Sequence, residues 1–138
     1  MSDDVFNPTG GDLGDDATMA QAAIDCMSAF SERFNARDLA GMDAQLHFPH
    51  VILSGEKLVI WERPGQLPAT FFDDLTATTG WDRSLYQRQQ PVLVGPNKVH
   101  LLVEYTRNRR DGSVIGRHQN LWIVTHQDRR WGIKLRSY

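Results

Sequence analysis

The sequence predicts an α+β domain, in which a curved antiparallel (mixed) sheet wraps around three helices that come early in the chain. In the first part of the chain, apolar residues recur at three- and four-residue steps, which is typical of amphipathic helices. The last forty residues read as three long strands joined by two hairpin turns. Because helices and strands are segregated along the chain, we expect the helices to pack on one face of the sheet.

Length and composition describe an ordinary single domain. The chain has 138 residues, 41% of them hydrophobic and 23% charged. A net charge of −2 gives no reason to expect nucleic acid or a membrane as a partner. No apolar run approaches the ~18 residues of a membrane span, and no basic-then-apolar segment opens the chain. We therefore expect a cytoplasmic protein, and the lone cysteine, Cys26, permits no internal disulfide.

An acidic stretch precedes the expected domain. Residues 1–16 contain five aspartates, no lysine or arginine, and no periodic pattern. Such a composition is typical of a flexible tail. We expect residues 17–138 to form the single folded domain.

Three helical segments are expected. In the first, which Asp16 or Thr18 would cap, an apolar stripe recurs at helical spacing: Ala20, Ala23, Ile24, Met27, Phe30 and Phe34. Asp38 is a good N-cap for a short second helix that reaches Leu46 and ends before Pro49. The third covers residues 64–79, with Pro68 in its first turn.

Extended segments follow each group of helices. Residues 50–54 and 56–61 read as a short strand pair, and residues 81–94 as a longer strand in which Pro91 indicates a bulge or an edge position. The three terminal strands cover residues 99–107, 116–125 and 131–136. The pair Asp111-Gly112 supplies the positive-φ residues that the first tight hairpin turn needs.

Polar side chains alternate along two neighbouring strands of the expected sheet. Tyr105 and Arg107 share one face of their strand, and His118, Asn120 and Trp122 share one face of the next. Facing a common space, this set could bind a carboxylate or enolate oxygen and carry a proton. On an outer or dimer face it would form cross-strand pairs instead. The sequence leaves both alternatives open.

Four further residues are candidates for a site. His50 opens the first expected strand and, as a neutral imidazole in an apolar pocket, could act with His118 in acid–base catalysis. Trp61 is a candidate for the pocket rim, while Tyr86 and Arg88 alternate and would both face the ligand. His47 and His50 have no third ligand at recognisable spacing, so we expect no metal. The chain has no glycine-rich phosphate loop and no serine-hydrolase or zinc-protease motif, and we expect no cofactor.

Four features of residues 17–138 resemble the nuclear transport factor 2-like superfamily, the cone-shaped α+β barrel of SnoaL-like cyclases and ketosteroid isomerases. The features are the helix ending in Phe34-Asn-Ala-Arg-Asp-Leu-Ala-Gly-Met42, the segment Leu46-His-Phe-Pro-His-Val-Ile-Leu-Ser-Gly55, the strand Gly116 to Thr125 around Trp122, and the terminal Arg130-Trp-Gly-Ile133. The resemblance implies a pocket between the curved sheet and the first helices. It also implies a homodimer across the outer sheet face.

The resemblance also frames the expected function. The isomerases carry an aspartate base near the first strand, where this chain reads His47-Phe-Pro-His50, and no Asp-Arg-Asp triad can be matched. We expect a small-molecule pocket that takes a hydrophobic or carboxylate-bearing ligand. One hypothesis is a lyase or isomerase that uses general acid–base chemistry on a hydrophobic carbonyl compound. The alternative is a non-catalytic dimerisation or ligand-binding module.

Overall fold

In the part of the chain that the structure describes, three helices and six strands build the domain. The structure is a computed structural model, and it describes residues 5–8 and 10–138. Along the chain the elements are α1 (Asp16–Asn35), α2 (Leu39–Asp43), β1 (Leu46–Ser54), β2 (Lys57–Trp61), α3 (Phe71–Thr79), β3 (Arg83–Val94), β4 (Lys98–Asn108), β5 (Val114–Gln127) and β6 (Arg130–Ser137).

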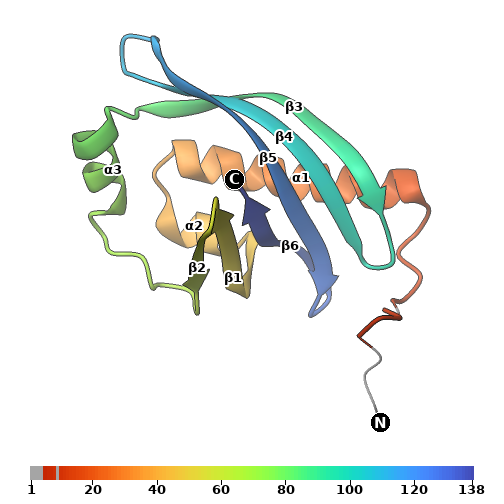
Figure 1. The fold of residues 1–138 in the computed structure, drawn as a ribbon. Coiled ribbons are helices and arrows are strands. Elements are labelled where there is room, and N and C mark those ends of the chain that lie inside the picture. Colours follow the sequence, from red (N-terminus) through yellow and green to blue (C-terminus); the bar gives the residue numbers. More distant parts are fainter. Residues whose placement is uncertain (1–4, 9) are drawn as a thin grey trace.

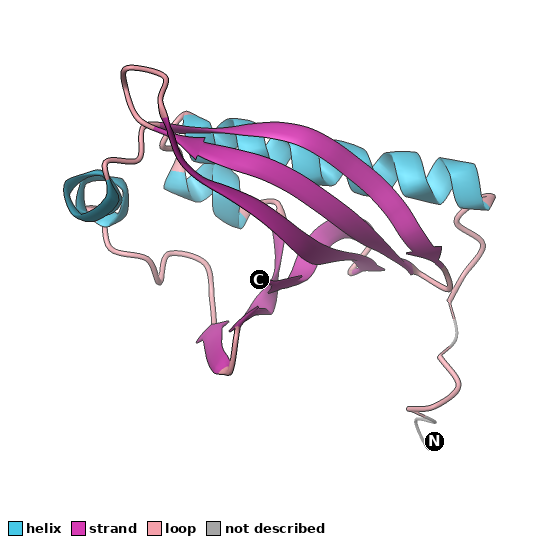
Figure 2. Cartoon of the chain, turned by 45° about the horizontal axis from the view of Figure 1, so that its top comes forward, coloured by secondary structure: helices cyan, strands magenta, loops and turns pink. Residues whose placement is uncertain are grey.

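The six strands form one mixed sheet in the order β2-β1-β6-β5-β4-β3. Strands β1 and β6 are parallel, and every other neighbouring pair is antiparallel. The long strands β3, β4 and β5 arch over α1, and α3 lies off the end of the arch near the β4–β5 hairpin (Figure 1). With the top of the molecule tilted forward, the long strands cross in front of α1 and the short strands lie at the other end of the sheet (Figure 2). The predicted fold class is confirmed.

The hydrophobic core lies between α1 and the concave face of the sheet. Phe30 of α1 meets Trp122 of β5 edge-on, with ring centroids 5.6 Å apart. Phe34, one turn later, contacts the rings of Phe71, Phe72 and Trp81 at 5.1–6.3 Å. Aromatic pairs with such edge-to-face geometry contribute about 0.5–1.5 kcal/mol beyond their buried area. Helix α3 is therefore held to the body of the protein mainly by aromatic contacts.

Helix α1 begins slightly before the expected start. Its N-cap is Asp15, whose side chain accepts a hydrogen bond from the Thr18 backbone N–H at 2.8 Å, so the expected caps Asp16 and Thr18 lie within the helix. Part of the expected flexible tail, residues 1–4 and 9, lies outside the described residues. Leu13 is half-buried and packs against the core. Leu13, three residues before α1, therefore contacts the folded body.

The second helix is shorter than expected and the first strand is longer. Helix α2 ends at Asp43, and β1 starts at Leu46 and continues through Pro49 to Ser54. Pro49 lies where the pairing of β1 with β6 is interrupted, between Leu46 and Val51. Because proline lacks a backbone N–H, it is tolerated in a strand at such an interruption. The same residue that was expected to end a helix therefore lies inside a strand.

Helix α3 starts later than the sequence predicts. It covers Phe71–Thr79, and Pro68 lies in the loop before it, where its carbonyl accepts a hydrogen bond from the Phe71 N–H at 3.0 Å. The helix ends at Gly80, whose left-handed φ of 78° suits glycine.

Two β-bulges decide which side chains face the core. In β3, Tyr86 pairs with Tyr105 but Arg88 pairs with Glu104, so Gln87 is an extra residue. In β6, Ile133 pairs with Val124 but Leu135 pairs with Ile123, so Lys134 is extra. Side chains alternate between faces every residue, so each extra residue moves the following side chains to the opposite face. A third shift follows Pro91 on the edge strand β3, as the proline predicted.

Candidate functional site

A cavity of about 400 Å³ lies between the concave face of the sheet and the helices α1 and α3. Its floor and walls carry aromatic and aliphatic side chains from four elements, α1, β1, β2 and α3: Phe30, Phe34, Ile52, Trp61, Phe71 and Leu75. Pockets of about 300–1,000 Å³ that are mainly apolar and hold a few convergent polar groups are typical small-molecule sites.

The polar side chains of this cavity are cationic or neutral. Arg107 and Arg136 both line it, together with His118 and the phenols Tyr86, Tyr105 and Tyr138. None of the fourteen lining residues is an aspartate or glutamate. The cavity therefore has a positive electrostatic character.

Arg136 of β6 is the deepest of these cations. It pairs with Trp122 of β5 on one side and with Ile52 of β1 on the other, and only 4% of its surface is exposed. Its guanidinium carbon lies 5.0 Å from the ring centroid of Phe30 and 5.2 Å from that of Trp61. Aromatic faces attract a cation, but they do not neutralise its charge.

Two hydrogen bonds hold this guanidinium. Arg136 donates its Nε–H to His50 Nε2 at 3.1 Å and an Nη1 proton to the Tyr138 hydroxyl at 3.0 Å. Within residues 5–8 and 10–138, no carboxylate oxygen lies within 4.0 Å of the Arg136 side-chain nitrogens. A buried charge without a counter-charge is costly, and an anion placed beside this guanidinium would offset that cost.

His50 lies behind Arg136 and does not line the cavity. Its side chain is fully buried, its Nδ1 lies 3.0 Å from the Ile133 carbonyl oxygen, and its Nε2 faces the Arg136 Nε–H. Since a carbonyl only accepts and a guanidinium only donates, Nδ1 carries the proton and Nε2 the lone pair. Burial, and next the charge of Arg136, lower the pKa of His50 to about 3. Both ring nitrogens are thus engaged, and the imidazole is neutral.

Three rings stack across the middle strands of the sheet. Tyr105 of β4 lies 5.0 Å from Tyr86 and 5.1 Å from His118, centroid to centroid, with nearly parallel planes. Asn120 donates its Nδ2–H to the Tyr105 hydroxyl at 3.3 Å. Burial, and next the neighbouring phenols, raise the pKa of Tyr105, and burial raises that of Tyr86 to about 12. Both phenols are therefore protonated.

His118 is the ionisable ring that faces the cavity. Its pKa is lowered by burial and next by the charge of Arg107. In the described part of the chain its ring nitrogens have no hydrogen-bond partner. A Cβ on Gly116, two residues earlier, would lie 3.3 Å from His118 Nε2, so the glycine leaves room for the ring. His118 is a neutral imidazole that is free to take a proton from a ligand.

The expected site residues other than Arg88 fall into two groups. Those that line the cavity are Trp61, Tyr86, Tyr105, Arg107 and His118. Those that are buried and do not line the cavity are His50, Asn120 and Trp122. The question of which face the polar residues of β4 and β5 share is answered by their register, because Tyr105 pairs with His118 and both lie inside the cone.

Arg88 lies outside the cone, contrary to the expectation that it faces the ligand with Tyr86. The bulge at Gln87 turns Arg88 to the convex face, where it is exposed and forms a 3.6 Å ion pair with Glu104. The bulge at Lys134 has the opposite effect on Arg136, which it turns inward. The alternation of apolar and basic residues along β6 predicts an outward arginine, so sequence reasoning missed the most buried cation of the site.

Comparisons with known proteins identify the fold. A protein of unknown function with a cystatin-like fold from Nostoc punctiforme superposes with a TM-score of 0.67 at 12% identity, covering 85% of this chain and 86% of that one. A nuclear transport factor 2-like protein of unknown function from Pseudomonas putida gives 0.66 at 11% identity, covering 90% and 87%. The chain has the nuclear transport factor 2-like fold. Neither a family model nor a curated protein sequence matches it.

One further neighbour of the same fold is named for an activity. A ketosteroid isomerase-like protein from Erwinia carotovora superposes with a TM-score of 0.57 at 13% identity, covering 86% of this chain and 92% of that one. At such identity the likeness concerns the fold alone. The nuclear transport factor 2-like resemblance in the sequence is therefore confirmed at the level of the fold, and the function has to be argued from the site.

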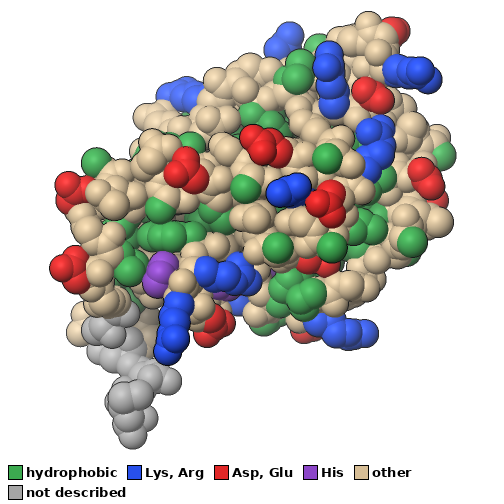
Figure 3. Space-filling view, turned by 180° about the vertical axis from the view of Figure 1, so that it is seen from behind, with side chains coloured by type: hydrophobic (Ala, Val, Ile, Leu, Met, Phe, Trp, Pro, Cys, Tyr) green, Lys and Arg blue, Asp and Glu red, His purple; other side chains and the backbone are tan. Residues whose placement is uncertain are grey.

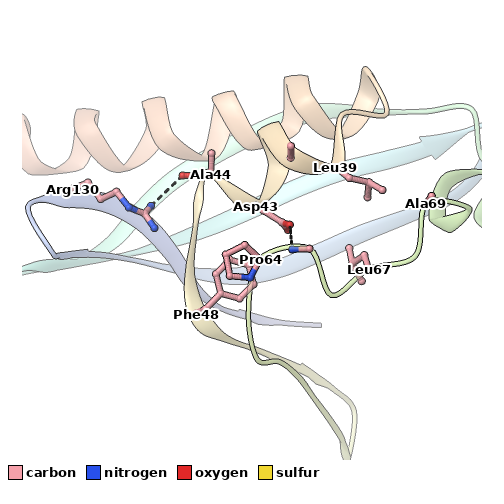
Figure 4. A pocket seen from close by; sticks show the side chains of 10 residues that line it. Leu39, Asp43, Ala44, Phe48, Pro64, Leu67, Ala69 and Arg130 are labelled. Carbon is pink, nitrogen blue, oxygen red and sulfur yellow. Dashed lines mark hydrogen bonds between the residues drawn. The ribbon is translucent and has the colours of Figure 1, made fainter.

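A second, larger hollow lies on the outside of the nuclear transport factor 2-like cone. It measures about 680 Å³ and lies between α2, β1 and the loop after β2 (Figure 4). Asp43 accepts a hydrogen bond from the Gly65 N–H at 2.8 Å, and Arg130 donates to the carbonyls of Ala44 and Leu46. This hollow is lined by one acidic and one basic side chain, whereas the cavity inside the cone has two arginines and no carboxylate, so the cavity inside the cone is the better candidate site.

On the face seen from behind, acidic and basic side chains are intermixed (Figure 3). Among residues 5–8 and 10–138, no group of three or more His, Cys, Asp or Glu is arranged to hold a metal ion. None of the helices in that part of the chain is both long and apolar enough to span a membrane.

Proposed function

We propose that the protein binds a small molecule that joins a carboxylate to an aromatic or otherwise hydrophobic body, in the cavity inside the cone. The observation that carries this proposal is Arg136, a cation with 4% exposure and no described carboxylate partner. A ligand carboxylate would supply the missing counter-charge through charge-assisted hydrogen bonds. The rings of Phe34, Trp61 and Phe71 would surround the apolar body.

A pair of probes that differ only in charge tests the proposal. We expect the wild-type chain to bind naphthylacetate about 10- to 100-fold more tightly than neutral naphthylacetamide, because hydrogen bonds to a charged group contribute about 1.5–3 kcal/mol. Arg136→Met should abolish this preference. Arg136→Lys keeps the charge but loses the planar fork, so it should retain only part of the preference. Isothermal titration calorimetry measures both affinities.

Arg88→Met is the matched control for this experiment. It removes the same side chain from the convex face, where Arg88 pairs with Glu104, and it should leave both affinities unchanged. Equal affinities of the wild-type chain for the acid and the amide would contradict the proposal. So would a preference for the acid that survives in Arg136→Met.

A second candidate function is acid–base catalysis on such a ligand, and the free imidazole of His118 favours it. A neutral imidazole could remove a proton from the carbon beside a ligand carbonyl, and the charge of Arg107 would stabilise the enolate oxygen that results. The proton would then return from the imidazolium to another position. A lyase or isomerase of this type needs no group beyond these side chains.

Hydrogen exchange into phenylpyruvate tests this second candidate. In heavy water the wild-type chain should accelerate deuterium uptake at the carbon beside the keto group, and His118→Gln should lower the acceleration about a hundredfold, which is typical of a general base. Because the pKa of His118 is lowered, the rate should stay constant as the pH falls past about 6.5. Nuclear magnetic resonance follows the exchange. If the chain binds naphthylacetate but does not accelerate deuterium uptake into phenylpyruvate, the catalytic candidate is refuted and the protein is a non-catalytic binding protein.

A further inference from the structure

The anion site depends on a hydrogen-bonded series that starts at the sheet backbone. The Ile133 carbonyl accepts the His50 Nδ1–H at 3.0 Å, and His50 Nε2 accepts the Arg136 Nε–H at 3.1 Å. His50 is fully buried and packs against Trp61, with ring centroids 5.5 Å apart. The imidazole thus has one orientation, and through it the arginine has one as well.

The series determines which part of the guanidinium is left for a ligand. Arg136 has five N–H groups: His50 accepts a hydrogen bond from the one on Nε, and the Tyr138 hydroxyl accepts one from Nη1. The three groups without a partner in the described part of the chain belong to Nη1 and Nη2, at the end of the side chain. A carboxylate would therefore approach the guanidinium from its Nη end.

The residue type at position 50 matters because it accepts a hydrogen bond without carrying a charge. A carboxylate there would hold the Arg136 Nε–H equally well, but it would also neutralise the guanidinium and remove its attraction for a ligand anion. An aromatic hydrocarbon ring would leave the charge but would not fix the orientation of the side chain. A neutral imidazole with its proton on Nδ1 meets both requirements.

We propose that His50 is a positioning residue that orients Arg136 toward the cavity while leaving its positive charge available for the carboxylate of a ligand. The inference rests on the proposed function, since it concerns the same anion site. It assigns His50 no proton transfer, in contrast to the catalytic role that the sequence suggested. Its role acts through Arg136, and so it should depend on the charge and hydrogen-bonding capacity of the side chain at position 50.

A matched pair of substitutions tests the inference with the same two probes. His50→Gln keeps a neutral acceptor and should preserve most of the preference for naphthylacetate over naphthylacetamide. In His50→Glu, the glutamate has nearly the same shape as the glutamine but adds a negative charge, and it should reduce that preference at least tenfold. His50→Phe removes the acceptor and should give an intermediate loss, of about fivefold. Binding of the amide should change less than twofold in all three variants.

The outcomes separate this inference from the proposed function. If Arg136→Met abolishes the preference but His50→Glu retains it, the anion site stands and the role of His50 is refuted. Equal losses for the acid and the amide in the His50 variants would also refute it, because they would indicate a general structural role. In the isotope-labelled wild-type chain, a scalar coupling between Arg136 Nε and His50 Nε2 should be detectable, and its absence would contradict the inference even if no variant folds.

Discussion

At the scale of single residues, the site is built from neutral groups around two cations. Burial keeps the phenols of Tyr86 and Tyr105 protonated, and it keeps His50 and His118 uncharged. No carboxylate lines the cavity to neutralise the positive charge of Arg136. The neutral imidazoles of His50 and His118 add no second positive charge that would repel it. The sequence identified five of the fourteen residues that line the cavity, because residue type and two-residue spacing are visible in it. It could not identify Arg136, whose orientation depends on a bulge.

The stability of the protein should depend on the pH through His50. The pKa of this residue is about 3 in the folded chain and about 6.5 in an unfolded one, so the unfolded state takes up the proton first. Its contribution to stability is complete above about pH 6.5 and decreases as the pH falls toward 3. Between about pH 6.5 and pH 4 the free energy of unfolding should fall by about 3 kcal/mol from this group alone.

Urea unfolding of the wild-type chain and of His50→Gln measures this contribution. The variant keeps every other titrating group, so the difference between the two pH profiles isolates His50. We expect the stability of the wild-type chain to fall more steeply toward acid than that of the variant. Parallel profiles would show that His50 does not remain neutral in the folded protein.

At the scale of elements, helix α1 is fixed to the sheet by a side-chain amide that forms two hydrogen bonds with the backbone of a strand. Asn35, the last residue of α1, accepts a hydrogen bond from the Ser84 N–H at 2.8 Å and donates one to the Ser84 carbonyl at 2.9 Å. Ser84 lies on the edge strand β3 and lines the cavity, so this contact also fixes one wall of the site. The sequence predicted the helix and the strand, but nothing in local periodicity indicates a contact between residues so far apart.

Asn35→Ala should therefore destabilise the fold by about 1–3 kcal/mol, because it leaves two backbone groups of Ser84 without partners. Chemical denaturation followed by circular dichroism measures the change. Glu32→Ala, an exposed substitution one turn earlier on α1, is the control and should change stability by less than about 0.5 kcal/mol. An equal effect of the two substitutions would contradict the role assigned to Asn35.

At the scale of the whole molecule, the convex face of the sheet is the candidate for self-association. Cross-strand rows place apolar side chains there, one row running through Leu93, Ile123 and Leu135 and the next through Leu102 and Leu121. Leu93 is 51% exposed. A second copy of the chain would cover these rows symmetrically, and we propose a homodimer across this face.

Light scattering at micromolar concentration tests the dimer. The particle mass should be about twice the 15.7 kDa of the chain, and Leu121→Arg should return it to the mass of one chain. Ala17→Arg, at an exposed position of α1, which packs on the opposite, concave face of the sheet, is the control and should leave the dimer intact. A wild-type chain that scatters as a monomer would refute the proposal.

The extra residue at Lys134 has a consequence for how chains of this fold are compared. After this extra residue, every side chain of β6 faces the side of the sheet opposite to the one that it would face in a regular strand. At identities of 11–13%, an alignment that treats the strand as regular would match Arg136 to outward positions in other proteins. A protein with an arginine at the aligned position could therefore lack the anion site, because its arginine would face outward. A protein with a different residue at that position could still have a cation inside the cone, at the position before or after it in the alignment.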